Sequence, residues 1–112
     1  KSLIVRRAST DDAVFWDNLE EIRHKNDEID LDMFNLLARR MRLADDIGRI
    51  KRKNNIAILQ ASRWNEILER GFQQGRERQL SDDFVEKFLN AVHQESIAHQ
   101  KTVMQQEKVK EI

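Results

Sequence analysis

Residues 19–51, LEEIRHKNDEIDLDMFNLLARRMRLADDIGRIK, decide the fold, because apolar side chains recur along them at alternating intervals of three and four. This spacing is typical of one face of an α-helix. Followed outward to the nearest breaks in the pattern, it predicts a single long helix from about residue 11 to residue 53. The stripe consists of Leu19, Ile22, Asn26, Ile29, Met33, Leu36, Arg40, Leu43, Ile47 and Ile50.

Arg40 occupies a position in this stripe where a leucine is expected. Lys51 lies about three turns further on, only roughly 20° away around the helix axis at ~100° per residue. A cation on a buried face costs several kcal/mol unless an anion meets it. Either the protein supplies this anion or a ligand does.

Two shorter helices are predicted after the break at Lys53-Asn54-Asn55. The first spans roughly residues 59–75, with Gly75 as its C-terminal stop. The next begins after Ser81, which can cap it, and runs from about 82 to 107. The pattern therefore predicts an all-α protein with three helices per chain, one of them very long. The stripe of the last helix is Val85, Leu89, Val92, Ser96, Gln100 and Val103.

The chain is divided as follows: residues 1–10 are a linker or tail, 11–108 a helical domain, and 109–112 a C-terminal tail. Thr10 is predicted to cap the long helix. Gly48 lies inside that helix, where glycine costs about 1 kcal/mol, and a close helix crossing would explain it. A long helix with apolar sides also favours a dimer.

Composition limits the classes of function. Of 112 residues, 36% are charged and none is proline or cysteine, so a disulfide scaffold and a thiolate metal site are excluded. The net charge of zero argues against a nucleic-acid or acidic-membrane binder. Without a membrane span or a signal-peptide block, a cytoplasmic protein is expected. The start at Lys1 rather than Met suggests a piece of something longer.

Polar residues interrupt the inward faces of all three predicted helices. Together they supply three cations, one hydroxyl and two amides but no carboxylate, which suits a small anion with two carboxylates. Taken singly, each has an ordinary explanation, such as a buried ion pair for the arginines or a solvated helix end for the lysine. The set consists of Arg40, Lys51, Gln60, Arg63, Ser96 and Gln100.

Arg23 lies 17 residues before Arg40, so it points roughly 100° away around the same helix. In one straight helix it cannot reach a ligand of Arg40. It could reach the equivalent pocket of a partner chain if two long helices pair.

Five segments carry a resemblance to a known family: IRHKNDEID at 22–30, LLARR at 36–40, IGRIK at 47–51, the single Arg63, and ESIAHQ at 95–100. In the order and spacing of these segments, the stretch from Leu19 to Gln105 resembles the all-helical class of chorismate mutases. The resemblance implies three helices per chain in an intertwined homodimer. It also implies the rearrangement of chorismate, a dicarboxylate, to prephenate without a metal or cofactor, as part of aromatic amino-acid biosynthesis.

The resemblance also implies roles. Arg40 would bind a substrate carboxylate, with Arg23 contributed by the neighbouring subunit, and Lys51 and Gln100 would donate hydrogen bonds to the breaking ether oxygen. Lys51, Gln100 and Arg40 would thus be catalytic. Trp64 is a departure, because the family commonly has there a glutamate that holds the ring hydroxyl. The other substrate-binding residues would be Arg63, Ser96 and Gln60, the last near the hydroxyl.

Other functions fit the same residues. One is an isochorismate-pyruvate lyase on the same scaffold, and another is a non-catalytic dimerisation or regulatory module of a larger enzyme, which Trp64 favours. A ligand-free coiled-coil domain is a third. Family members often occur fused to other enzymes, so an upstream 3-deoxy-7-phosphoheptulonate synthase domain is the expected fusion partner.

Overall fold

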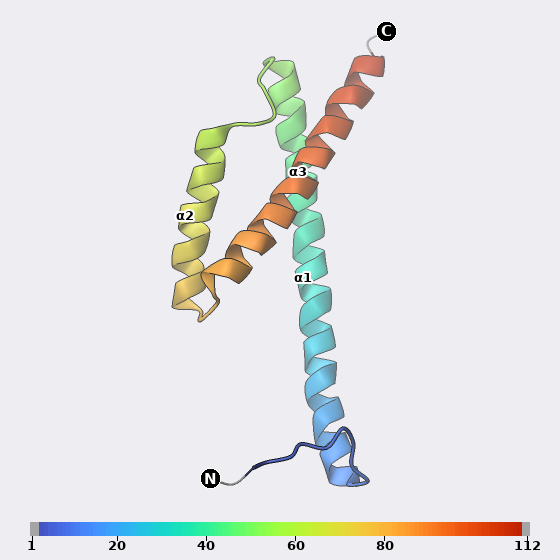
Figure 1. The fold of residues 1–112 in the computed structure, drawn as a ribbon. Helices are drawn as coiled ribbons and strands as arrows, with labels where there is room; N and C mark the ends of the chain where they lie inside the picture. The colour runs from blue at the N-terminus through green and yellow to red at the C-terminus, as the bar shows by residue number, and fades with distance from the viewer. Residues whose placement is uncertain (1–2, 111–112) are drawn as a thin grey trace. The chain divides into compact units, whose positions relative to one another are not determined.

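The computed structural model describes the backbone of residues 3–110 and the side chains of residues 3–106. It contains three helices: α1 (Ala13–Lys53), α2 (Ala61–Glu77) and α3 (Asp82–Lys110), as Figure 1 shows. The predicted all-α class, with one very long helix, is confirmed. Residues 1, 2, 111 and 112 of the predicted tails lie outside the described residues.

Short polar side chains mark the starts of two helices. Ser81 caps α3 as predicted, since its Oγ accepts a hydrogen bond from the backbone N–H of Phe84 at 3.2 Å. The predicted cap of α1 is wrong by two residues. Asp12 Oδ1 accepts the N–H of Val14 at 3.0 Å, whereas Thr10 Oγ1 accepts only the N–H of Asp12 at 3.3 Å. An aspartate at this place also complements the helix dipole.

The end of α2 differs from the prediction. Gly75 is not its stop, because the helix continues to Glu77 and Gln79 takes the left-handed conformation at φ 61°. Gly75 is instead buried against α3, where a Cβ would lie 2.6 Å from Val85 Cγ2. The glycine is therefore needed for close packing rather than for backbone freedom. The end of α1 is followed by Asn55 at φ 55°, within the predicted break.

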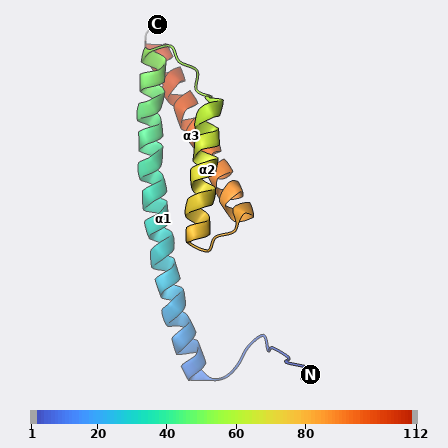
Figure 2. The same ribbon diagram turned by 90° about the vertical axis from the view of Figure 1, so that its left-hand side faces the viewer.

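The chain divides into two compact units, Lys1–Leu36 and Leu37–Ile112. In the first, the indole N–H of Trp16 donates to the carbonyl of Thr10 at 2.7 Å and so ties the preceding segment to the helix. The second contains the C-terminal part of α1, α2 and α3. Within it α2 and α3 pack together, and α3 crosses the last turns of α1 (Figures 1 and 2).

The core of the second unit is formed by Met41, Ala44 and Val92, with Leu37 packed against them. On α1 these residues stand one position after Leu36, Arg40 and Leu43 in the predicted stripe, which is about 100° around the helix. Within the described chain, the face of α1 that α3 covers is therefore the neighbouring one, and the stripe is largely exposed. Its large members remain exposed: Ile22, Ile29, Met33, Leu36, Leu43, Ile47 and Ile50.

The stripe of α3, in contrast, is buried as predicted except for Leu89, which is half-buried. Val85, Val92 and Val103 are 5–7% exposed, and the polar Ser96 and Gln100 are only 9% and 6% exposed. In the described part of the chain, no helix combines the length and the apolar character needed to cross a membrane.

Candidate active site

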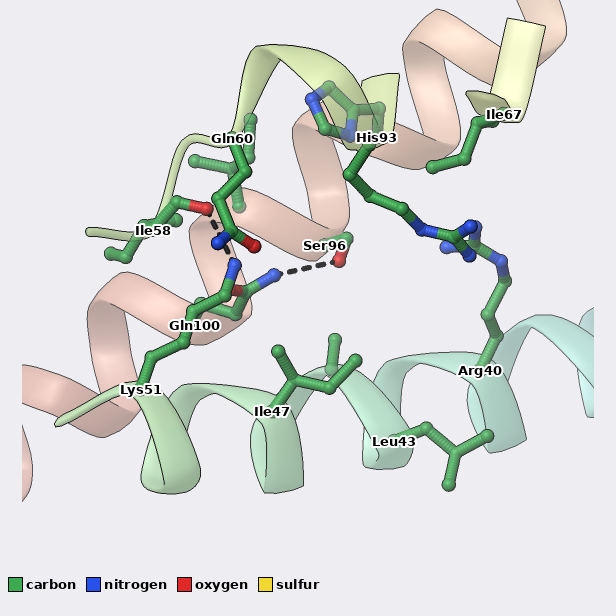
Figure 3. A pocket seen from close by; sticks show the side chains of 13 residues that line it. Arg40, Leu43, Ile47, Lys51, Ile58, Gln60, Ile67, His93, Ser96 and Gln100 are labelled. Atoms are coloured by element: carbon green, nitrogen blue, oxygen red, sulfur yellow. Dashed lines mark hydrogen bonds between the residues drawn. The ribbon is translucent and has the colours of Figure 1, made fainter. Parts of the chain in front are cut away.

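A cavity of about 380 Å³ lies in the second unit, between the end of α1, the start of α2 and the middle of α3 (Figure 3). Side chains at helical spacing on α1 and α3 form two of its walls. The segment between α1 and α2 adds Ile58. The lining residues are Arg40, Leu43, Ala44, Ile47, Lys51, Ile58, Gln60, Arg63, Ile67, His93, Ser96, Ile97 and Gln100.

A chain of hydrogen bonds fixes the polar end of this cavity (Figure 3). Lys51 Nζ donates to the carbonyl of Ile58 at 2.6 Å and to Gln100 Oε1 at 3.0 Å. Gln100 Nε2 in turn donates to Ser96 Oγ at 3.2 Å. Because an ammonium group can only donate, Lys51 sets the orientation of the Gln100 amide. The ammonium group has three N–H bonds and the amide two, so each retains one for a ligand.

Burial lowers the pKa of Lys51, since removal from water disfavours the charged form. The partners of Lys51 in the cavity are a carbonyl and an amide, both neutral. No carboxylate in the described part of the chain pairs with this ammonium group, so a bound anion would supply the negative charge that these partners lack. The site is arranged to gain electrostatic energy when such a ligand enters.

Arg40 and Arg63 bring two more cations to the cavity. Arg40 is half-buried and points from α1 into the cavity, and no carboxylate of the described residues pairs with it (Figure 3). Arg63 is exposed and contacts Glu66 one turn later on α2 at 3.3 Å. An exposed pair of this kind contributes little, so Arg63 remains available to a ligand. Both guanidinium groups suit the bidentate binding of a carboxylate.

The structure brings six of the seven predicted site residues to this one cavity: Arg40, Lys51, Gln60, Arg63, Ser96 and Gln100. Gln60, the residue before α2, points its side chain toward Lys51 and Gln100 (Figure 3). Arg23 belongs to the first unit, where it pairs with Glu20 at 3.0 Å, and it does not line the cavity.

His93 was missed as a site residue in the sequence analysis. It lies three residues before Ser96 and seven before Gln100, so the helical repeat places all three on one face of α3. Its ring stacks on Trp64 of α2, with the centroids 4.4 Å apart and the planes inclined by 23°. Burial is the largest cause that lowers the pKa of His93, and the positive charges of Arg40 and Lys51 lower it further.

No group of three or more metal-ligating side chains was found within the part of the chain that the structure describes. The lining supplies donors, cations and apolar surface, which together can bind, fold and polarise an anion. Among the described residues, this lining holds neither a carboxylate nor a thiol. Such a site suits a reaction that proceeds by restraint and electrostatic stabilisation.

The chain matches a known protein family. The family model described as chorismate mutase type II matches residues 22–101, well over half of the chain and including every residue of the cavity. No curated protein matches the chain.

Proposed function

We propose that this chain, which belongs to the chorismate mutase type II family, performs its isomerase reaction in the cavity formed by α1, α2 and α3. The reaction of a chorismate mutase is the rearrangement of chorismate to prephenate. One observation carries the proposal: three cations, Arg40, Lys51 and Arg63, line a cavity to which no described residue contributes a carboxylate. This arrangement fits a compact dianion.

Arg40 and Arg63 bind the two carboxylates in this proposal. The substrate must fold so that its enolpyruvyl arm lies over its ring, and two fixed cations favour that shape. Leu43 and Ile47 of α1 and Ile97 of α3 supply the apolar surface against which the ring packs. Ser96 adds a hydroxyl beside the bound acid.

Lys51 and Gln100 stabilise the transition state. The rearrangement breaks an ether C–O bond, and negative charge grows on that oxygen. Lys51 Nζ and Gln100 Nε2 are already oriented by Ile58 and Ser96, so their remaining N–H bonds need no reorganisation during the reaction. A millionfold acceleration requires about 8 kcal/mol, and the loss of one charged donor removes roughly 3–4 kcal/mol of it.

A second copy of the chain completes the site in this proposal. The exposed apolar stripe of α1, including Ile22 at 58%, Ile29 at 55% and Leu36 at 57%, supports a homodimer in which the long helices pair. An intertwined arrangement lets Arg23 of one protomer reach the cavity of the other. Fusion to an upstream 3-deoxy-7-phosphoheptulonate synthase, a place in aromatic amino-acid synthesis and a cytoplasmic location remain predictions.

The test follows the loss of chorismate absorbance with the purified chain. Lys51→Ala should lower kcat/KM by roughly 100-fold or more. Lys87→Ala, a matched control at an exposed lysine that pairs with Asp83, should leave the rate unchanged. Product analysis with isochorismate separates the lyase. Equal rates for wild type and Lys51→Ala, or pyruvate release as the main reaction, would refute the proposal.

A further inference from the structure

The cavity contains few free hydrogen-bond acceptors. Its three cations can only donate. Among the amides and hydroxyls, Gln100 Oε1 already accepts from Lys51, and Ser96 Oγ accepts from Gln100. The Ile58 carbonyl also accepts from Lys51. Two side chains of the lining carry an acceptor atom for which the described residues give no hydrogen bond: neutral His93, through one ring nitrogen, and Gln60, through its amide oxygen.

His93 is the better fixed of these two. Its imidazole is half-buried and stacks on Trp64, so a ring on α2 sets the plane of a ring on α3. Gln60 is exposed, and its side chain makes no capping hydrogen bond at the start of α2. A hydrogen-bonding group held in place in advance loses less entropy when a ligand binds.

The substrate has a group that needs such an acceptor. Chorismate carries two carboxylates, an ether oxygen and one ring hydroxyl. The carboxylates and the ether oxygen are themselves acceptors and meet the cations and amide donors. The hydroxyl proton requires an acceptor, and burying it unpaired would cost roughly 1–3 kcal/mol.

On the basis of the function proposed above, we propose that His93 accepts the hydrogen bond of the substrate's ring hydroxyl and thereby determines specificity. Trp64 is the positioning residue, because it holds the His93 ring but does not itself line the cavity. The tryptophan that interrupts the family resemblance thus has a function in this chain through its neighbour on α3.

The charges around His93 support this assignment. Arg40 and Lys51 face it from α1, and Arg63 lines the same cavity from α2. Burial, followed by the charges of Arg40 and Lys51, lowers the pKa of His93 below its ordinary value. The neutral ring, with one nitrogen free to accept, is therefore the form present at neutral pH.

The experiment compares chorismate with an analogue in which hydrogen replaces the ring hydroxyl. Each enzymatic rate is divided by the uncatalysed rate of the same substrate, so that only the contribution of the protein is compared. Wild type should favour chorismate by roughly tenfold or more, since a site that pairs with a hydroxyl rejects the analogue that lacks it. His93→Phe keeps a ring on Trp64 but has no nitrogen. This variant should lose that preference because its rate acceleration falls for chorismate. Its rate acceleration for the deoxy analogue should stay unchanged.

Conservative variants distinguish hydrogen bonding from structure. His93→Gln restores an acceptor and should recover part of the preference. Trp64→Leu should weaken it, and Trp64→Phe, which keeps an aromatic ring, should retain it. Circular dichroism and the thermal midpoint confirm that each variant is folded.

Two results would overturn the assignment. His93→Phe could slow both substrates equally, which would indicate a structural role, or Gln60→Leu could abolish the preference while His93→Phe retains it. A wild-type chain that turns over chorismate but shows either result contradicts only the role of His93. A wild-type chain without turnover contradicts the proposed function itself.

Discussion

Gly48 of α1 lies directly against the backbone of Gln100 of α3. A Cβ at residue 48 would stand 3.0 Å from Gln100 Cα and 3.3 Å from its carbonyl oxygen. A close helix crossing that explains this glycine is therefore present, and it lies at a residue of the candidate site. The distance between the two helices at this point sets how far the Gln100 amide reaches into the cavity.

Gly48→Ala should impair catalysis more than folding. The added methyl group meets backbone that cannot rotate away, so α3 must shift, at a cost of about 1–3 kcal/mol. Part of this cost is offset by the higher helix propensity of alanine, about 1 kcal/mol. A shift of a few tenths of an ångström moves Gln100 and should lower kcat by roughly tenfold. Steady-state kinetics and thermal unfolding measure the two effects.

Gly71→Ala is the matched control for that substitution. A Cβ at Gly71 would meet mainly the terminal methyl group of Leu89, which is the far end of a flexible side chain. This variant should keep kcat within about threefold of wild type, because Leu89 can change rotamer and no cavity residue moves. If both variants lose kcat alike, the crossing at Gly48 has no special relation to the site.

Gln100→Glu should make activity depend on pH. The wild-type amide donates at every pH, so the rate should not fall as the pH is raised from 5 to 7. A glutamate donates only when protonated, and Lys51 beside it favours the ionised form. The variant should therefore gain activity as the pH falls. A pH–rate profile of both proteins checks this, and a steep fall for wild type between pH 5 and 7 would contradict the role of Gln100.

The sequence predicted the helices well because apolar periodicity and breaks are local signals. The three-and-four spacing from Leu19 to Ile50 was long enough to identify one helix, and Ser81 marked the start of another. The ends were less accurate. Gly75 was predicted to end a helix, but a glycine is needed at this position because Val85 of α3 packs closely against it. Tertiary packing of this kind leaves no signal in the local sequence.

The candidate site was predictable only in part. Cations in an apolar stripe revealed Arg40 and Lys51, because a charge at such a position conflicts with its surroundings. His93 gave no such conflict, since an isolated histidine in a helix is ordinary. Its relevance comes from Trp64, which lies 29 residues earlier in the sequence and meets it only after α2 and α3 pack. The core residues of α1, Met41 and Ala44, lie one position after members of the predicted stripe.

His99 and Asp45 should make stability depend on pH. His99 Nδ1 lies 2.9 Å from Asp45 Oδ1, joining α3 to α1, and this hydrogen bond raises the pKa of His99. A histidine whose pKa is raised by folding stabilises the protein fully below its unfolded value of about 6.5. This contribution is lost as the pH rises through the folded value.

The difference in Tm between wild type and His99→Gln should therefore be larger at pH 5.5 than at pH 9. The pair is partly exposed, so the effect should not exceed ~1 kcal/mol. Lys87→Ala breaks the exposed contact with Asp83 and should give the same small difference at both pH values, because it leaves the contact between His99 and Asp45 intact. A pH-independent difference for His99→Gln would show that only packing is lost.

Mixing two inactive variants should restore activity if the site is shared between protomers. In a heterodimer of Arg23→Ala and Arg40→Ala, one cavity has Arg40 from its own chain and Arg23 from the other, while the second cavity lacks both. Random pairing makes half of the dimers mixed, each with one complete site, so about a quarter of wild-type activity should return.

Arg40→Ala mixed with Lys51→Ala is the control. These two residues line the same cavity of one chain, so every site in that mixture lacks one of them and no activity should return. Equal activity of the two mixtures after denaturation and refolding together would place Arg23 outside the partner's site.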